Sequence, residues 1–219
     1  MVIFSAETKQ KLYTAVLSDV LDGLGYPDQA LRPFVRPLDE SLVLLGKART
    51  GGYTNTYSVE DGENPYDLEI KLLDDLKPGE VPVLGCDGPT ERLAPWGELL
   101  TTAALQRGGV GCVTDGLVRD VRKIRELKFP VFHGGIGPLD SRGRGRMIEM
   151  DRPVACGGVT VHSGDIIFGD VDGVVVVPQA IAEEAFKLAL AKVTDENHTR
   201  DELLKGNLLA DVYAKYGVL

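Results

Sequence analysis

Apolar residues near the start of the chain recur with a helical period. Between residues 6 and 25 they stand at every fourth position, which places them on one face of a helix. These residues are Leu12, Val16, Val20 and Leu24. Gly23 and Gly25 can end the helix. The pattern therefore predicts a helix with one buried face over residues 6–25.

A second helix is predicted within residues 67–80, where four leucines share one face before a Pro-Gly pair that stops the helix. These are Leu68, Leu72, Leu73 and Leu76. Residues 41–54 precede this helix and are typical of a strand and a turn. Residues 81–86, VPVLGC, follow it as a short apolar run typical of a buried strand.

The middle of the chain alternates between segments with a helical period and short apolar runs typical of strands. The pattern predicts helices over residues 96–106 and 119–128, and strands over residues 110–116 and 130–133. Strands that alternate with helices at this spacing form βαβ units, whose strands pair in parallel.

The pattern changes after Pro153. Residues 153–178 contain short runs of Val and Ile that are broken by Gly-Gly, Ser-Gly-Asp and Asp-Gly, as in hairpins and barrel strands. A long helix from residue 179 into the 190s and a short helical tail complete the chain. We therefore expect an α/β fold with a β-rich centre and outer helices, formed by residues 1–219 as a single domain.

Composition narrows the choice of function. The chain has 33 acidic and 24 basic residues and a formal net charge of -9. This balance disfavours nucleic acid as a partner, because binding to phosphates needs an excess of Lys and Arg. The first residues, MVIFSAETKQ, resemble neither a signal peptide nor a membrane span, so we expect a cytoplasmic protein without a membrane partner.

The three cysteines are far apart in the sequence and form no CxxC pair, so we expect reduced, buried thiols. They are Cys86, Cys112 and Cys156.

A candidate anion site lies at the start of the predicted helix 96–106. Pro95 comes just before this helix, where a proline favours helix entry. The backbone N–H groups of Gly97, Glu98, Leu99 and Leu100 then lack partners within the helix, and together with the helix dipole they can bind a carboxylate. The alternative for Glu98 is a surface acid that only stabilises the helix start.

Twenty residues separate Glu98 from the pair Arg119-Asp120. One helix and one strand fill this interval, so both ends meet at one edge of the sheet. Arg119 can bind a carboxylate or enolate oxygen with two parallel hydrogen bonds, and Asp120 can hold a divalent cation, with Asp115 as a second candidate. The alternative is an ordinary helix-start acid beside a solvated arginine.

The type of metal follows from the available ligands. The three histidines form no HxH or HExxH pair, which disfavours zinc. Carboxylates together with water and a chelating substrate suit Mg²⁺ or Mn²⁺. The glycine-rich residues 134–146 lack a P-loop ending and are predicted to be a loop.

Two segments, WGELLTTAALQRGGVGCVTDGLVRDVRKIRELKFPVF and GGVTVHSGDIIFGDVDGVVVVP, resemble a known superfamily. It contains the 4-hydroxy-4-methyl-2-oxoglutarate aldolases and the RraA-type regulators of ribonuclease E activity. In the aldolase branch an acid, 20 residues and Arg-Asp form the signature, which Glu98, Arg119 and Asp120 match here. The resemblance is dense from about residue 95 to 178.

This resemblance implies a class II pyruvate aldolase with oxaloacetate decarboxylase activity. Asp120 would hold Mg²⁺ or Mn²⁺ partly through water, and Arg119 would bind the keto or enolate oxygen of pyruvate. The amides of residues 97–100 would bind its carboxylate, and Glu98 would position a metal-bound water for proton transfer.

The resemblance also implies a swivelling β/β/α fold, of the phosphohistidine-domain type, assembled as trimers or paired trimers. An acid from the C-terminal part of a neighbouring subunit completes the site in this scheme, and Glu196 is the candidate. Two features depart from the pattern: Glu98 stands where aspartate is common, and the segment GENPYDLEIKLL replaces a GDN-type segment. Both bear on the natural substrate.

Two other functions share this scaffold. One is a non-catalytic regulator that binds a protein such as ribonuclease E, a branch that generally lacks the aspartate after the arginine. The other is a lyase or decarboxylase that acts on another oxo acid or a sugar acid. A Schiff-base aldolase fits less well, because Lys71, Lys123 and Lys128 fall on predicted amphipathic helices.

Overall fold

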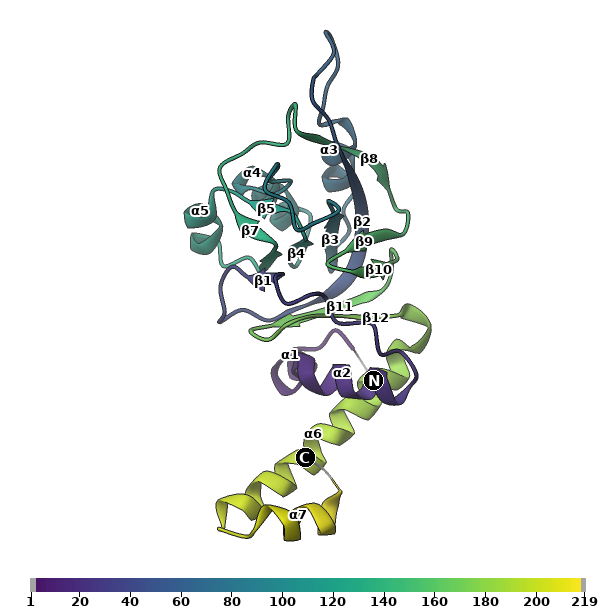
Figure 1. Cartoon of the computed structure of the whole chain (residues 1–219), viewed down its shortest axis with the longest axis vertical. Helices are drawn as coiled ribbons and strands as arrows, with labels where there is room; N and C mark the ends of the chain where they lie inside the picture. Colours follow the sequence, from purple (N-terminus) through teal and green to yellow (C-terminus); the bar gives the residue numbers. More distant parts are fainter. Residues whose placement is uncertain (1–2, 218–219) are drawn as a thin grey trace.

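The computed structural model describes residues 3–217, and its centre is one strongly curved sheet (Figure 1). Its eight strands run in the order β1-β6-β4-β3-β2-β11-β12, with β8 as a further partner of β2. The strands are β1 (Arg36–Pro37), β2 (Leu44–Asn55), β3 (Glu80–Gly85), β4 (Cys112–Thr114), β6 (Val131–His133), β8 (Gly145–Met150), β11 (Ile166–Asp170) and β12 (Gly173–Val177).

The four strands β2, β3, β4 and β6 pair in parallel, as the alternating sequence pattern predicted. Helices connect them and lie outside the sheet (Figure 1). These helices are α3 (Asp67–Asp74), α4 (Glu98–Gln106) and α5 (Val121–Glu126). Their apolar faces and the adjoining face of the sheet enclose a core that includes Leu72, Leu84, Trp96 and Ile124.

The other strands pair in antiparallel fashion, except for the short parallel pair β5–β7. The hairpin β11–β12 turns at an Asp-Gly pair and joins the sheet through β2. Two small sheets accompany it, β9 (Val154–Cys156) with β10 (Val159–Val161), and β5 (Leu117–Val118) with β7 (Gly135–Ile136). The predicted series of short strands over residues 153–178 is therefore confirmed.

The two ends of the large sheet approach each other. The Arg36 guanidinium on β1 donates to the carbonyl oxygens of Val171 and Asp172, in the turn beside β12, at 2.9 and 3.0 Å. The sheet is therefore nearly closed, and a valine-rich core that includes Val83, Val113 and Val176 lies within its curve.

Strand β2 changes partner along its length. On one edge it pairs with β3, whereas on the other edge its first residues pair with β11 and its last residues with β8. Within residues 41–54, where a strand and a turn were expected, the turn is confined to Ser41, and the glycines lie inside the strand. At Gly46 a side chain would meet Val110 Cγ2 at 2.6 Å, so a glycine is needed for close packing.

The N-terminal segment forms two helices rather than one. They are α1 (Ala6–Lys11) and α2 (Thr14–Gly23). Leu12 and Tyr13 between them are extended. The break has a tertiary cause: both carboxylate oxygens of Asp170, at the end of β11, accept hydrogen bonds from Thr14, one from its N–H and one from its hydroxyl. This satisfies a backbone N–H at the start of α2.

The C-terminal helices extend away from the sheet. After the short 3-10 helix η1 (Gln179–Ile181), α6 (Ala182–Leu204) packs against α2, and α7 (Leu209–Tyr216) folds back beside its far end (Figure 1). Helix α6 is longer than the sequence pattern predicted. In the described part of the chain, no helix combines the length and the apolar character needed to cross a membrane.

Other predicted boundaries shift by a few residues. The helix predicted from residue 96 begins at Glu98, and the helix predicted over 119–128 is only the six residues of α5. The predicted loop 134–146 contains β7 and the first residues of β8. Cys86, Cys112 and Cys156 are free and buried, as expected.

Candidate functional site

Two side chains, Trp96 and Thr101, fix the start of α4. Trp96 is fully buried, and its indole Nε1 donates to Thr101 Oγ1 at 2.9 Å. The Thr101 hydroxyl in turn donates to the carbonyl oxygen of Gly97 at 2.9 Å. The backbone amides at this end of α4 therefore keep a fixed direction. Leu99 and Leu100 are in its first turn, where N–H groups have no acceptor within the helix.

Asp120 meets this helix start. It is the N-cap residue of α5 and has left-handed backbone angles, with φ of 57° and ψ of 28°. Its Oδ2 accepts a hydrogen bond from the N–H of Glu98 at 3.3 Å. A side chain at Gly97 would meet the same Oδ2 at 2.8 Å, so glycine at this position permits the approach. The structure thus brings together the start of α4 and Asp120, two features that the sequence places 22 residues apart.

Arg119 lies between two carboxylates. Its Nε is 3.8 Å from Asp120 Oδ2, and its Nη1 is 3.6 Å from Asp140 Oδ1. Tyr66 donates its hydroxyl proton to Asp140 Oδ2 at 2.7 Å. Partial burial raises the pKa of Asp140, but the Tyr66 hydrogen bond and the Arg119 charge outweigh it, so this pKa lies below its usual range. Asp140 therefore stays ionised and orients the guanidinium.

A further acid, Glu69, projects from α3 and is only 8% exposed. Tyr53 on β2 donates to Glu69 Oε2 at 2.7 Å. Burial raises the pKa of Glu69 to about 7, although the Tyr53 hydrogen bond and the charge of Arg119 act in the opposite direction. Glu69 is therefore a carboxyl group that changes its charge near neutral pH.

These residues surround one cavity of about 310 Å³. Its lining residues come from α3, from the start of α4, and from the loops that follow β5 and β7. They are Tyr66, Glu69, Ile70, Ala94, Pro95, Trp96, Gly97, Leu99, Leu100, Arg119, Asp120 and Asp140. Five of the residues singled out from the sequence line it, namely Gly97, Leu99, Leu100, Arg119 and Asp120.

Glu98 is placed differently from the expectation. Its Oε1 accepts a hydrogen bond from Thr102 Oγ1 at 2.9 Å, one turn further along the same helix. The lining residues of the cavity do not include it. Only its backbone N–H, which binds Asp120, takes part in the site.

Asp115 is a structural residue and not a second metal ligand. It is 2% exposed and accepts hydrogen bonds from three backbone N–H groups. The donors are Cys86 at 2.7 Å, Gly88 at 3.0 Å and Gly157 at 3.2 Å. Asp115 therefore joins the ends of β3 and β4 to the β9–β10 turn, and it is not among the residues that line the cavity.

The cavity suits a cation held by few protein ligands. Three carboxyl groups, those of Glu69, Asp120 and Asp140, line it beside one guanidinium. The Asp120 side chain is 48% exposed, so water can complete the coordination of an ion bound there. Within residues 3–217, no three His, Cys, Asp or Glu side chains are close enough to enclose a metal on their own. Asp120 with waters and substrate is the arrangement that fits.

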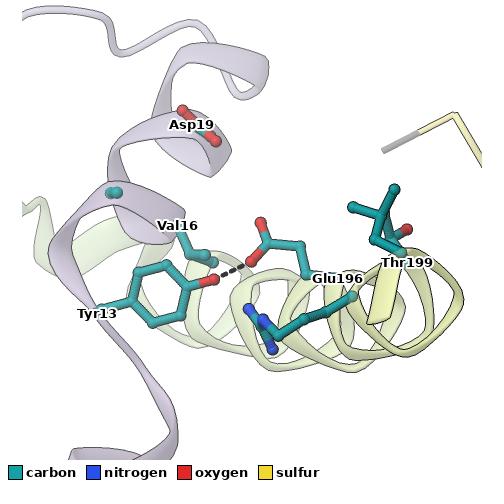
Figure 2. Close-up of a pocket in the computed structure, with 8 residues that line it drawn as sticks. Tyr13, Val16, Asp19, Glu196 and Thr199 are labelled. Carbon is teal, nitrogen blue, oxygen red and sulfur yellow. Dashed lines mark hydrogen bonds between the residues drawn. The ribbon is translucent and has the colours of Figure 1, made fainter. Parts of the chain in front are cut away.

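Glu196 lies in a separate pocket between α2 and α6 (Figure 2). This pocket has a volume of about 340 Å³, and Tyr13 donates its hydroxyl to the Glu196 carboxylate there. Partial burial raises the pKa of Glu196, and the charge of Arg200 opposes this effect. Glu196 does not line the cavity of Arg119 and Asp120 within the same subunit.

Fold and site together define an α/β protein in which the start of a helix and three carboxyl groups line one cavity beside an arginine. A model of the RraA-like family, described as Aldolase/RraA, matches residues 14–176. The chain therefore belongs to the RraA-like family.

Relatives of this chain carry different kinds of names. The chain is 34% identical over 197 residues to a protein of Halalkalibacterium halodurans named "Putative 4-hydroxy-4-methyl-2-oxoglutarate aldolase", an alignment that covers 90% of this chain and 87% of the relative. A solved structure from Pseudomonas syringae, of an uncharacterized protein, superposes with a TM-score of 0.84 at 27% identity and covers 97% of this chain and 95% of the other.

Another solved structure is that of Streptomyces coelicolor RraAS2, described as an unusual member of the RNase ES inhibitor RraA protein family. It superposes with a TM-score of 0.77 at 27% identity, and the match covers 90% of this chain and 96% of that one.

Proposed function

We propose that this protein is a divalent-metal-dependent carbon–carbon lyase that acts on small 2-oxo acids. The specific form of the proposal is a pyruvate aldolase of the 4-hydroxy-4-methyl-2-oxoglutarate type with oxaloacetate decarboxylase activity. The observation that carries it is the meeting of Arg119 and Asp120 with the start of α4 in one cavity. Relatives named as aldolases support the same class of reaction.

In this proposal the start of α4 binds the substrate carboxylate. The N–H of Glu98 is already bound to Asp120, so the N–H groups of Leu99 and Leu100 remain for the ligand. The positive end of the helix dipole adds to their attraction for an anion. Gly97 leaves room beside them, since it has no side chain.

Arg119 binds the ketone oxygen of the substrate. Cleavage of the carbon–carbon bond next to a ketone leaves an enolate, whose negative charge develops on that oxygen. A guanidinium fixed by Asp140 and Asp120 does not have to reorient as this charge appears, which lowers the barrier. A divalent cation, when bound at Asp120, supplies further positive charge in the same cavity.

The lining of the cavity disfavours a Schiff-base mechanism. The lining residues within the described chain include no lysine. Lys71, Lys123 and Lys128 are all exposed, so none of them lies in the apolar pocket that a Schiff-base lysine needs.

A regulatory function is the second candidate, because a structural relative is described as a member of an RNase inhibitor family. The two candidates differ in one measurement, the release of pyruvate from oxaloacetate. We expect turnover with Mg²⁺ or Mn²⁺ that is lost when EDTA is added and returns with excess metal. If the metal-loaded protein releases pyruvate no faster than buffer with the same metal, the proposed enzymatic function is contradicted.

The assembly belongs to the proposal as well. We propose that residues 1–219 act as a single domain of the swivelling β/β/α type in trimers or paired trimers, with Glu196 of a neighbouring subunit near the cavity. Light scattering coupled to size-exclusion chromatography measures the number of subunits.

A further inference from the structure

Glu69 is a buried acid that the proposed reaction has not yet used. It lines the same cavity as Arg119 and Asp120, although it comes from α3, a different element. One of its oxygens is fixed by the Tyr53 hydroxyl at 2.7 Å. Glu69 therefore places an acid on the wall of the cavity that α3 forms, which neither the start of α4 nor Asp120 provides.

The local sequence explains how an acid reaches this position. Glu69 precedes Leu72 and Leu73 by three and four residues, so all three share the buried face of α3. Burial of a carboxyl group is unfavourable unless it is hydrogen-bonded or uncharged. Tyr53 provides the hydrogen bond, and Tyr53 itself is buried. Tyr53 and Glu69 are therefore both buried, and Glu69 also lines the cavity.

We propose that Glu69 is the proton-transfer residue of this site, which exchanges a proton with the substrate as the carbon–carbon bond breaks or forms. This inference rests on the proposed function and adds a residue to it. The family resemblance implied that Glu98 positions a metal-bound water for proton transfer, but its side chain accepts a hydrogen bond from Thr102.

The proton balance of each reaction assigns Glu69 one task. In aldol cleavage, the Glu69 carboxylate takes the proton of the hydroxyl at carbon 4. The bond between carbons 3 and 4 then breaks, and its electron pair forms the enolate of pyruvate. Glu69 returns the same proton to carbon 3, so no proton is gained or lost overall.

Decarboxylation of oxaloacetate needs less from this residue. Carbon dioxide leaves without the help of a base, and the electron pair of the broken bond forms the enolate. Protonated Glu69 then gives its proton to carbon 3 and recovers one from water. Bond cleavage itself does not need Glu69, and this difference separates the two activities in a variant.

Several groups face Glu69 and set its charge. Asp140 favours the neutral carboxyl, whereas Arg119 and the Tyr53 hydrogen bond favour the carboxylate. Its polar and titratable neighbours are Tyr53, Tyr66, Cys86, Arg119 and Asp140. The balance leaves the pKa of Glu69 at about 7, so both the base and the acid form are populated at neutral pH.

Exchange of the pyruvate methyl protons in D₂O isolates the proton-transfer step. We expect the Mg²⁺-loaded wild-type protein to catalyse this exchange, followed by proton NMR, with a rate that rises through about pH 7 as Glu69 ionises. Glu69→Gln keeps the shape and an acceptor for Tyr53 but cannot take a proton. It should lose exchange by about 100-fold or more and decarboxylation by less than about tenfold. The surface variant Glu126→Gln should retain both activities.

Each outcome decides between the two proposals. If the wild type shows neither activity, the proposed function fails. If the wild type is active and Glu69→Gln exchanges within twofold of it, or loses both activities equally, Glu69 is not the proton-transfer residue while the function stands. Should Glu69→Gln not fold, Tyr53→Phe takes its place. Loss of that hydrogen bond raises the pKa of Glu69, so the rise in rate must move to higher pH, and an unmoved profile overturns the proposal.

Discussion

The backbone of Asp120 determines which replacement tests the site most cleanly. Its left-handed φ of 57° is tolerated by Asp and Asn but unfavourable for alanine, by about 1 kcal/mol. Asp120→Ala also leaves the Glu98 N–H without its side-chain acceptor. Asp120→Asn avoids both effects, because the amide oxygen can accept the same hydrogen bond. It removes only the negative charge.

The expected magnitude follows from that single change. A bound divalent cation contributes several kcal/mol to the stabilisation of negative charge in a transition state. If weaker binding of the cation by Asn loses about 3 kcal/mol of this stabilisation, the rate falls by about 100-fold, since each 1.36 kcal/mol is a factor of ten. The free energy of unfolding should change by no more than about 0.5 kcal/mol, because Asp120 is exposed.

Two assays are needed for this variant. Initial rates of oxaloacetate decarboxylation at saturating Mg²⁺ report the chemistry, and urea unfolding followed by circular dichroism reports stability. Asp74→Asn, on the exposed surface of α3, is the matched control and should behave like the wild type. An Asp120→Asn protein that works within tenfold of wild type would show that Asp120 does not hold the cation.

Three further predictions concern other parts of the site. Arg119→Lys should lower kcat/KM for oxaloacetate at least tenfold with an unchanged circular dichroism spectrum, because an ammonium group cannot contact Asp140, Asp120 and the substrate in one plane; near wild-type kinetics would contradict its role. Asp115→Ala should lower the free energy of unfolding in urea by about 3 kcal/mol, since two buried backbone N–H groups and one partly buried one lose their acceptor; an unchanged midpoint would show that water replaces it. Borohydride added with pyruvate should leave the intact mass unchanged, whereas a trapped adduct would remove the metal-enolate mechanism.

Local patterns predicted the parallel part of the fold well. The strands over residues 81–86, 110–116 and 130–133 and the helix that ends at residue 106 each have a clear period or a short apolar run. The break between α1 and α2 was not predictable, because its cause is Asp170, which lies far along the chain. The length of β2 was underestimated for a similar reason. Its Gly51-Gly52 pair suggests a turn locally, but both glycines pair with β8 and lie close to Met147 and Glu149, inside the strand.

The site was predictable where chain direction alone decides it. The helix and strand between Glu98 and Arg119 return the chain to the same edge of the sheet, so their meeting followed from the sequence. Glu69 was missed, although an acid three and four residues before Leu72 and Leu73 is a signal of a buried carboxyl group. Asp140 lies in a glycine-rich segment without any period, and only the folded chain shows that it contacts Arg119.

The change of partners along β2 has a consequence for how the chain is made. This strand is synthesised early, whereas β8 and β11, which cover one of its edges, are encoded much later. Until they leave the ribosome, a nascent chain presents a long, glycine-containing edge that can pair with other polypeptides. Such sequence-distant pairing slows folding and favours aggregation of partly made chains. A chaperone that binds this segment during synthesis should therefore improve the yield of native protein.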